Sequence, residues 1–187
     1  MEIYLIRHTA TATNPGFCHG QSDVPLAVSF DNDVTALHNK LPEFNDDCLV
    51  FSSPLSRCLN LAETFSDTVQ SDDRLQELNF GDWEGKRFDD LPADVLRHWT
   101  ENYVTAAPPN GESFTDLYQR AGEFWKELLA TKAEQVLIVT HAGIIRALLA
   151  NALSLPLTSA FQLRIDSSSV SKLRYSDDFL FVEYVNL

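Results

Sequence analysis

The sequence predicts an α/β fold, a three-layer α/β/α sandwich with a mostly parallel central sheet and an antiparallel edge strand. Three short aliphatic runs carry this prediction, because each suits a strand buried on both faces of a parallel sheet: Ile3 to Ile6, Cys48 to Phe51, and Val136 to Val139. Near the end of the chain, Ser169 to Tyr175 and Phe179 to Asn186 form two further strands joined across Ser176 to Asp178. This hairpin predicts the antiparallel edge.

Helix signals alternate with these strands. Pro54 lies near the start of PLSRCLNLAETFSDTV, and Gly143 opens GIIRALLANAL. Ser113 and Asp116 predict an N-terminal cap for a helix that runs to about Ala130, and its apolar residues repeat at the helical period. A further helix is expected from about Asp31 to Leu41. We interpret the apolar stripes as core rather than as cofactor contacts.

Composition limits the domain organisation and the partners. The chain has 187 residues, of which 44% are hydrophobic, so a single domain over residues 1–187 is expected. Its formal net charge of -13 would repel nucleic acid and anionic membranes. No apolar span of membrane length and no leader segment is evident, which predicts a cytoplasmic protein, as a monomer or homodimer.

Cysteine and histidine patterns predict neither a disulfide framework nor a metal site. Cys18, Cys48 and Cys58 are odd in number and share no close spacing, so all three are expected as reduced thiols. The five histidines form no i,i+4 pair around a glutamate. We therefore expect no metal and no cofactor.

Polar residues follow the three predicted strands and would meet along one edge of the sheet. Arg7 and His8 end the first strand, Ser53 and Arg57 follow the second, and His141 follows the third. Arginines bind phosphate because each planar guanidinium matches phosphate oxygens and stays charged. Helix N-termini after Ser53 and His141 would add backbone N–H donors. The sequence thus predicts an anion pocket within an acidic protein.

Cleavage of a phosphomonoester also needs a carboxyl group, because the departing alkoxide must take up a proton. The segment RLQELNFGDWEG and the residue before it supply four candidates: Asp73, Glu77, Asp82 and Glu84. Composition alone does not choose among them.

Taken together, these segments resemble the histidine phosphatase superfamily, also called the phosphoglycerate mutase-like superfamily, over nearly the whole chain. Five segments in order carry the resemblance: Arg7-His8 with Thr11 and Asn14; Ser52 to Arg57; Leu75 to Glu77 with FGDWEG; Gly111 to Ser113; and Thr140 to Gly143. The resemblance implies a phosphoglycerate mutase-like fold and a two-step phosphoryl transfer without a metal ion.

The resemblance also implies roles for individual residues. His8 would be the nucleophile and become phosphorylated, while Arg7, Arg57 and His141 would hold the phosphoryl oxygens. Glu77 would protonate the leaving oxygen and then deprotonate the attacking water. Four further residues would bind the substrate: Thr11, Asn14, Gln21 and Ala142. We place selectivity in Phe17, Trp83, Trp99 and Tyr103. Cys18, near the expected pocket mouth, is interpreted as a bystander, although an exposed thiol there would make activity sensitive to oxidation.

Within the superfamily, two segments are similar to alpha-ribazole phosphatases, which dephosphorylate the nucleotide-loop precursor of cobalamin. They are Gly16 to Leu26 and Pro109 to Phe114. The expected substrate is alpha-ribazole-5'-phosphate, a small phosphorylated metabolite. Thr9 and Ala10 depart from the common glycine and Glu or Gln of the superfamily. The alternatives are a broad-specificity small-molecule phosphatase, a protein phosphohistidine phosphatase, and a non-catalytic phosphate-binding module.

Overall fold

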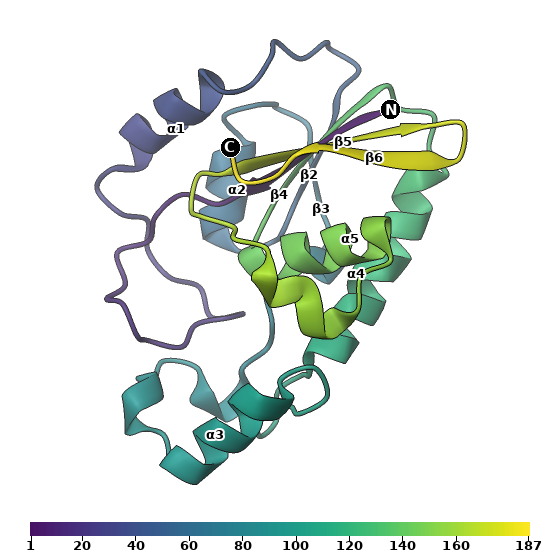
Figure 1. Ribbon diagram of the computed structural model, residues 1–187. Helices are drawn as coiled ribbons and strands as arrows, with labels where there is room; N and C mark the ends of the chain where they lie inside the picture. Colours follow the sequence, from purple (N-terminus) through teal and green to yellow (C-terminus); the bar gives the residue numbers. More distant parts are fainter.

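A six-stranded sheet forms the centre of the computed structural model, which describes residues 1–187 (Figure 1). The strand order is β3-β2-β4-β1-β5-β6. The strands are β1 (Glu2–Arg7), β2 (Leu49–Ser52), β3 (Val69–Ser71), β4 (Gln135–Thr140), β5 (Val170–Ser176) and β6 (Phe179–Tyr184). The first four are parallel to one another, while β5 is antiparallel to β1, and β6 is antiparallel to β5. The predicted fold class, with its antiparallel edge, is therefore confirmed.

Helices cover both faces of this sheet (Figure 1). They are α1 (Phe30–His38), α2 (Ser56–Ala62), α4 (Phe114–Leu129) and α5 (Ala142–Leu153), while α3 (Ala93–Asn102) lies away from the sheet. Four short 3-10 turns link them: Asp73–Leu75, Gly81–Trp83, Phe88–Asp90 and Leu157–Gln162. None of the helices has both the length and the apolar character needed to cross a membrane.

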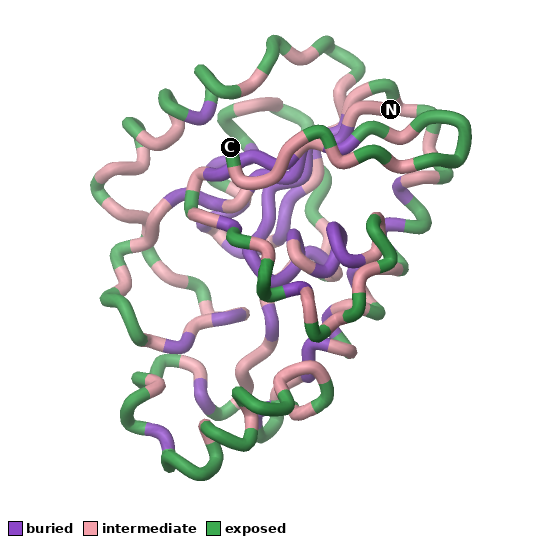
Figure 2. The backbone as a smooth tube through the Cα atoms, viewed as in Figure 1, coloured by how far each residue is buried: buried purple, intermediate pink, exposed green.

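The side chains of β1 show how the two faces are filled. Ile3 and Leu5 belong to the larger core, which packs against α4 and α5. Tyr4 and Ile6 point to the other face and belong to the core shared with α1 and α2. All four side chains are buried, as expected for a strand covered on both sides. In Figure 2 the buried residues are accordingly concentrated along the central strands.

Local sequence signals predicted several element boundaries correctly. Ser113 caps α4 through a capping box with Asp116. Asp177 and Asp178 adopt φ values of 52° and 63°, which suit a tight turn between antiparallel strands, so the predicted hairpin is confirmed. The predicted helix from Asp31 to Leu41 is shorter in the structure and forms α1.

Two elements differ from the expectation. The helix predicted from Pro54 begins at Ser56 and ends at Ala62, because the Ser66 hydroxyl accepts the Thr68 N–H and turns the chain into β3. Helix α3 was not predicted. None of its residues is fully buried, and its apolar face is short, with Leu96 and Trp99 only partly buried.

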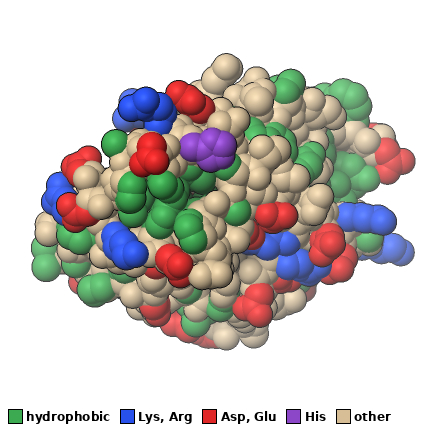
Figure 3. Space-filling view, turned by 90° about the horizontal axis from the view of Figure 1, so that it is seen from below, with side chains coloured by type: hydrophobic (Ala, Val, Ile, Leu, Met, Phe, Trp, Pro, Cys, Tyr) green, Lys and Arg blue, Asp and Glu red, His purple; other side chains and the backbone are tan.

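Helix α3 lies at the bottom of Figure 1, beyond the helices that cover the sheet. A small separate core of Cys18, Trp83 and Leu91 anchors this region. Seen from that side, hydrophobic side chains gather near a histidine and are bordered by charged side chains of both signs (Figure 3).

Candidate active site

The carboxyl ends of β1, β2 and β4 bring the predicted anion-binding residues together. The His8 N–H donates to the carbonyl of Thr140, and the Ser53 N–H donates to the carbonyl of Val139, so the segments after the three strands stay side by side. The rings of His8 and His141 lie 5.1 Å apart between centroids. Arg57 and Arg7 both act electrostatically on the His8 ring. We name this set of Arg7, His8, Arg57 and His141 the anion cluster.

His8 is neutral and has one nitrogen free to react. Its Nδ1 lies 2.7 Å from the carbonyl oxygen of Thr9, which can only accept, so Nδ1 carries the proton and Nε2 keeps its lone pair. Burial lowers the pKa of His8 to about 3, the positive charges of Arg57 and Arg7 act in the same direction, and the hydrogen bond to Thr9 opposes them. The unprotonated imidazole is therefore the dominant form at neutral pH.

The two arginines are fixed by backbone carbonyls rather than by carboxylates. Arg57 donates to the carbonyls of Gly20 and Ser22, and Arg7 donates to the carbonyl of Ile165. Neither guanidinium forms an ion pair, and the Nε of each is buried without a hydrogen-bond partner. Arg57 is only 1% exposed. An unpaired buried cation is costly, so this arrangement favours a bound anion.

His141 closes the cluster from the start of α5. Its Nε2 lies 2.9 Å from the Ser53 hydroxyl and 3.4 Å from the sulfur of Cys58. The ring is fully buried, and this burial is the main reason why the pKa of His141 lies well below its usual value. Electrostatic effects of His8 and Arg57 act in the same direction. His141 is thus a neutral hydrogen-bonding group in this structure.

Among the four candidate carboxylates, Glu77 is the one positioned at the cluster. Its Oε2 accepts the Gly143 N–H at 3.1 Å, and its Oε1 accepts the Leu78 N–H at 3.0 Å. A side chain at position 143 would place its Cβ 2.2 Å from Glu77 Oε1, so glycine is needed for this close approach. The carboxylate of Glu77 therefore lies beside the first turn of α5, at Gly143, which is two residues after His141.

The other three carboxylates have different positions. Asp73 is exposed, and exposed Asp82 accepts hydrogen bonds from the side-chain amide of Asn110. Glu84 accepts the N–H groups of Phe80 and of the three loop residues Gly20 to Ser22. Burial raises the pKa of Glu84, but hydrogen bonds from Ser22, Gln21 and Phe80 outweigh it and leave the pKa below its usual value. Glu84 is thus an ionised loop anchor.

Substrate-binding residues predicted from the sequence are only partly brought to the cluster. Gln21 Nε2 donates to the carbonyl of Glu77, and Ala142 is the first residue of α5. Thr11 instead pairs with the hydroxyl of Thr13. Asn14 is exposed and lines a cavity of about 420 Å³ with Phe17.

Two further positions singled out in the sequence, Cys18 and Thr9, are buried in the structure. Cys18 is buried, and burial raises the pKa of its thiol to about 12, so the condition for oxidation sensitivity, an exposed thiol, is not met. Thr9 is fully buried and its hydroxyl has no hydrogen-bond partner, while its carbonyl oxygen orients His8. The role of Thr9 therefore rests on its backbone.

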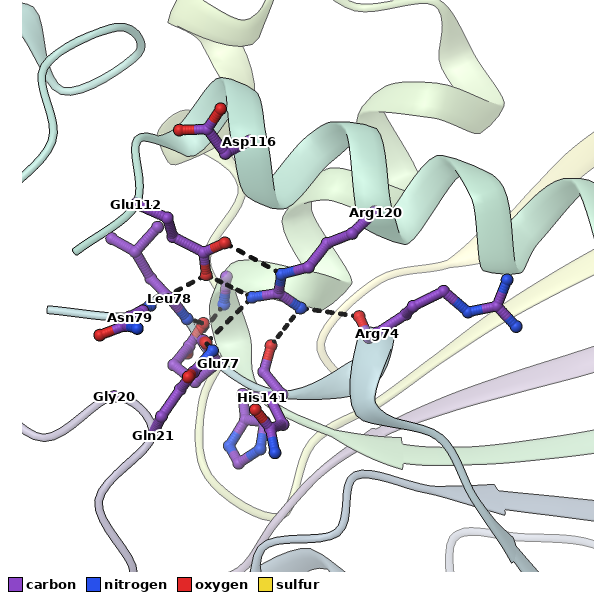
Figure 4. A network of polar contacts seen from close by, with 12 residues as sticks. Gly20, Gln21, Arg74, Glu77, Leu78, Asn79, Glu112, Asp116, Arg120 and His141 are labelled. Atoms are coloured by element: carbon purple, nitrogen blue, oxygen red, sulfur yellow. Dashed lines mark hydrogen bonds and ion pairs between the residues drawn. The ribbon is translucent and has the colours of Figure 1, made fainter. Parts of the chain in front are cut away.

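Sequence reasoning missed Arg120, which holds the segment that carries Glu77. Figure 4 shows the Arg120 guanidinium between the Glu112 carboxylate and the backbone of this segment. It donates to the carbonyls of Arg74, Gln76 and Glu77, and Glu112 in turn accepts the Asn79 N–H. The sequence shows Arg120 only as a polar residue within an amphipathic helix, so nothing marked it as a contact of the acid segment.

We expect Arg120→Met to lower the free energy of unfolding by about 2 kcal/mol, because three carbonyls and one largely buried carboxylate would lose their partner. Urea denaturation measures this change. Arg164→Met is the matched control, since Arg164 is 81% exposed in its pair with Asp166 and its loss should cost less than about 0.5 kcal/mol. Equal losses in the two variants would contradict the structural role of Arg120.

Comparison with known proteins identifies the class that this fold and cluster define. The chain belongs to the histidine phosphatase superfamily (branch 1), whose family model matches residues 3–187, so the resemblance seen in the sequence is confirmed. Among individual proteins, the adenosylcobalamin/alpha-ribazole phosphatase of Escherichia coli K12 is 30% identical, with 100% of this chain and 96% of the relative covered.

Solved structures give the same picture. The crystal structure of the alpha-ribazole phosphatase from Shigella flexneri has a TM-score of 0.92 and 30% identity, covering 100% of this chain and 96% of that chain. A mycobacterial glucosyl-3-phosphoglycerate phosphatase has a TM-score of 0.84 and 28% identity, covering 99% of this chain and 98% of that chain. The chain is thus similar over its full length to phosphatases with different substrates.

Proposed function

We propose that the chain is a phosphomonoester hydrolase that works through a phosphohistidine on His8. One observation carries the proposal: a buried Arg57 and a half-buried Arg7, both without ion pairs, flank a neutral histidine whose Nε2 is free. A phosphoryl group between Arg7 and Arg57 would supply the missing negative charge and lie against that nitrogen. The family membership supports the same reaction.

The first step transfers the phosphoryl group to the protein. The lone pair on His8 Nε2 forms a bond to phosphorus while the bond from phosphorus to the leaving oxygen breaks. Arg7, Arg57 and His141 donate hydrogen bonds to the phosphoryl oxygens, whose charge they stabilise in the transition state. Glu77 gives its proton to the leaving oxygen, which departs as an alcohol.

The second step releases phosphate. Glu77, now a carboxylate, takes a proton from a water molecule as that water attacks phosphorus, and the bond from phosphorus to Nε2 breaks. Inorganic phosphate leaves, while His8 and Glu77 return to their starting forms. The neutral state of His8 matters in the first step, because a ring protonated on Nε2 has no lone pair with which to attack phosphorus.

The proposed substrate is alpha-ribazole-5'-phosphate. Full-length similarity to proteins named alpha-ribazole phosphatases supports it, together with the two loop segments that resemble those enzymes. A small phosphorylated metabolite is thus the proposed partner, and the single-domain organisation and cytoplasmic location expected from the sequence belong to the proposal.

A panel of phosphomonoesters tests the substrate. We expect kcat/KM for alpha-ribazole-5'-phosphate to exceed those for phosphoserine, 3-phosphoglycerate and sugar phosphates by at least about 10-fold, a difference of about 1.4 kcal/mol in transition-state binding. Comparable values across the panel would contradict the specific assignment and indicate a broad-specificity phosphatase.

A further inference from the structure

A second cavity lies on the Glu77 side of the anion cluster. Its volume is about 180 Å³, and Glu77 and Gly143 form part of its wall. In the proposed mechanism Glu77 protonates the leaving oxygen, so the alcohol part of the substrate must extend from this carboxyl group. The cavity is therefore the space that the leaving group meets next.

Aromatic side chains from four separate segments build the remaining wall. They are Phe80 of the acid segment, Trp99 of α3, Phe114 at the start of α4 and Phe161 of the turn after α5. Phe80 and Trp99 lie 5.8 Å apart between ring centroids, and Phe114 and Phe161 lie 5.2 Å apart. Such walls favour a flat ring, which can make offset or edge contacts with several aromatic faces.

Arg146 brings a positive charge into the same cavity. It lies three residues after Gly143 on α5, so both face the same side of the helix. Its Nε donates to the carbonyl of Leu163, and its guanidinium lies 5.0 Å from the centroid of the Phe161 ring. The two terminal nitrogens of Arg146 form no hydrogen bond and no ion pair within the chain, which leaves them free to bind a ligand.

We propose that this cavity is a ring-binding subsite, in which the aromatic walls hold a flat heteroaromatic group of the leaving alcohol and Arg146 binds an acceptor atom or the face of that ring. The inference rests on the proposed function, because Glu77 marks the leaving-group side only if it is the acid. Arg146, through its guanidinium, and Trp99, through its aromatic face, are then specificity-determining residues. A carboxylate on the leaving group is the competing occupant for Arg146, but four aromatic side chains would then border it with few polar partners.

Two substrates that differ only by the ring test this subsite: alpha-ribazole-5'-phosphate and ribose 5-phosphate. For the wild-type protein we expect at least a 10-fold higher kcat/KM with the ring. Arg146→Met should lower kcat/KM for alpha-ribazole-5'-phosphate about 10-fold, as expected for a lost hydrogen bond to a charged group, and change ribose 5-phosphate less than about 2-fold. Trp99→Leu, which keeps an apolar side chain and removes the aromatic face, should also lower kcat/KM only for the ring-bearing substrate, about 5-fold.

Arg97→Met on α3 is the matched control, because Arg97 is exposed and lies outside the cavity. It should leave both kcat/KM values unchanged. Equal losses for the two substrates in Arg146→Met would overturn the subsite, since Arg146 would then act through Glu77. A loss confined to 3-phosphoglycerate would overturn it in favour of a carboxylate site. Wild-type protein that hydrolyses ribose 5-phosphate without a preference for the ring would refute this inference and the alpha-ribazole assignment but leave the phosphomonoester hydrolase in place, whereas the absence of any phosphatase activity would refute the proposed function.

Discussion

His8→Asn is expected to lower kcat by roughly 10⁴-fold or more with every phosphomonoester, because asparagine has no basic nitrogen to attack phosphorus. The amide of asparagine can still donate to the Thr9 carbonyl that fixes His8, so the backbone of this segment should be preserved. Steady-state hydrolysis of alpha-ribazole-5'-phosphate measures the loss. The variant should still bind inorganic phosphate, since Arg7, Arg57 and His141 remain.

His98→Asn supplies the control for this substitution. His98 is an exposed residue of α3, and the same change there should leave kcat within about 2-fold of the wild type. Residual activity of His8→Asn above about one hundredth of the wild-type value would contradict a nucleophilic role for His8.

Glu77→Gln is expected to lower kcat/KM about 10²- to 10⁴-fold for alkyl phosphates, the range typical of a lost general acid. For p-nitrophenyl phosphate the loss should be less than about 10-fold, because a good leaving group departs without a proton. The ratio kcat/KM reports on transfer to His8 and leaves out the later hydrolysis. Comparison of the two substrates therefore isolates proton donation from any general damage to the site.

Two other acidic positions sharpen the assignment. Asp82→Asn should leave kcat/KM unchanged for both substrates, since Asp82 is exposed and accepts hydrogen bonds from Asn110. Glu84→Gln should lower kcat/KM equally for both substrates, because it loosens the loop that contains Gln21 and that Arg57 contacts at Ser22. A dependence on the leaving group in Asp82→Asn or Glu84→Gln, rather than in Glu77→Gln, would contradict the role of Glu77.

The parts of the fold that were predictable are those with strong local patterns. The runs in β1, β2 and β4 are apolar throughout because both faces of these strands are buried, and the capping box of α4 is written in four residues. Helix α3 has only a short apolar face, and its partners are a few aromatic residues contributed by distant segments. Its position depends on tertiary contacts that no short window of sequence contains.

The site shows the same division. Arg7 ends β1, His8 and His141 directly follow β1 and β4, and Arg57 lies in the first turn of α2 after β2, so the parallel pairing of these strands brings all four to one edge of the sheet. The choice of Glu77 over Glu84 required the hydrogen bonds of both carboxylates, which come from Gly143 in one case and from the loop at Gly20 in the other. Arg120 and Arg146 lie on helices, where an arginine facing the solvent and one facing a site look alike in sequence.

Trapping the phosphorylated protein tests the central claim most directly. The Glu77→Gln variant, incubated briefly with ³²P-labelled p-nitrophenyl phosphate, should form the intermediate quickly and hydrolyse it slowly, because only the second step still needs Glu77. After denaturation in alkali and peptide mapping, we expect an acid-labile, alkali-stable label on His8 that approaches one per chain. Turnover of the same substrate with no label, or with the label on another residue, would contradict the mechanism.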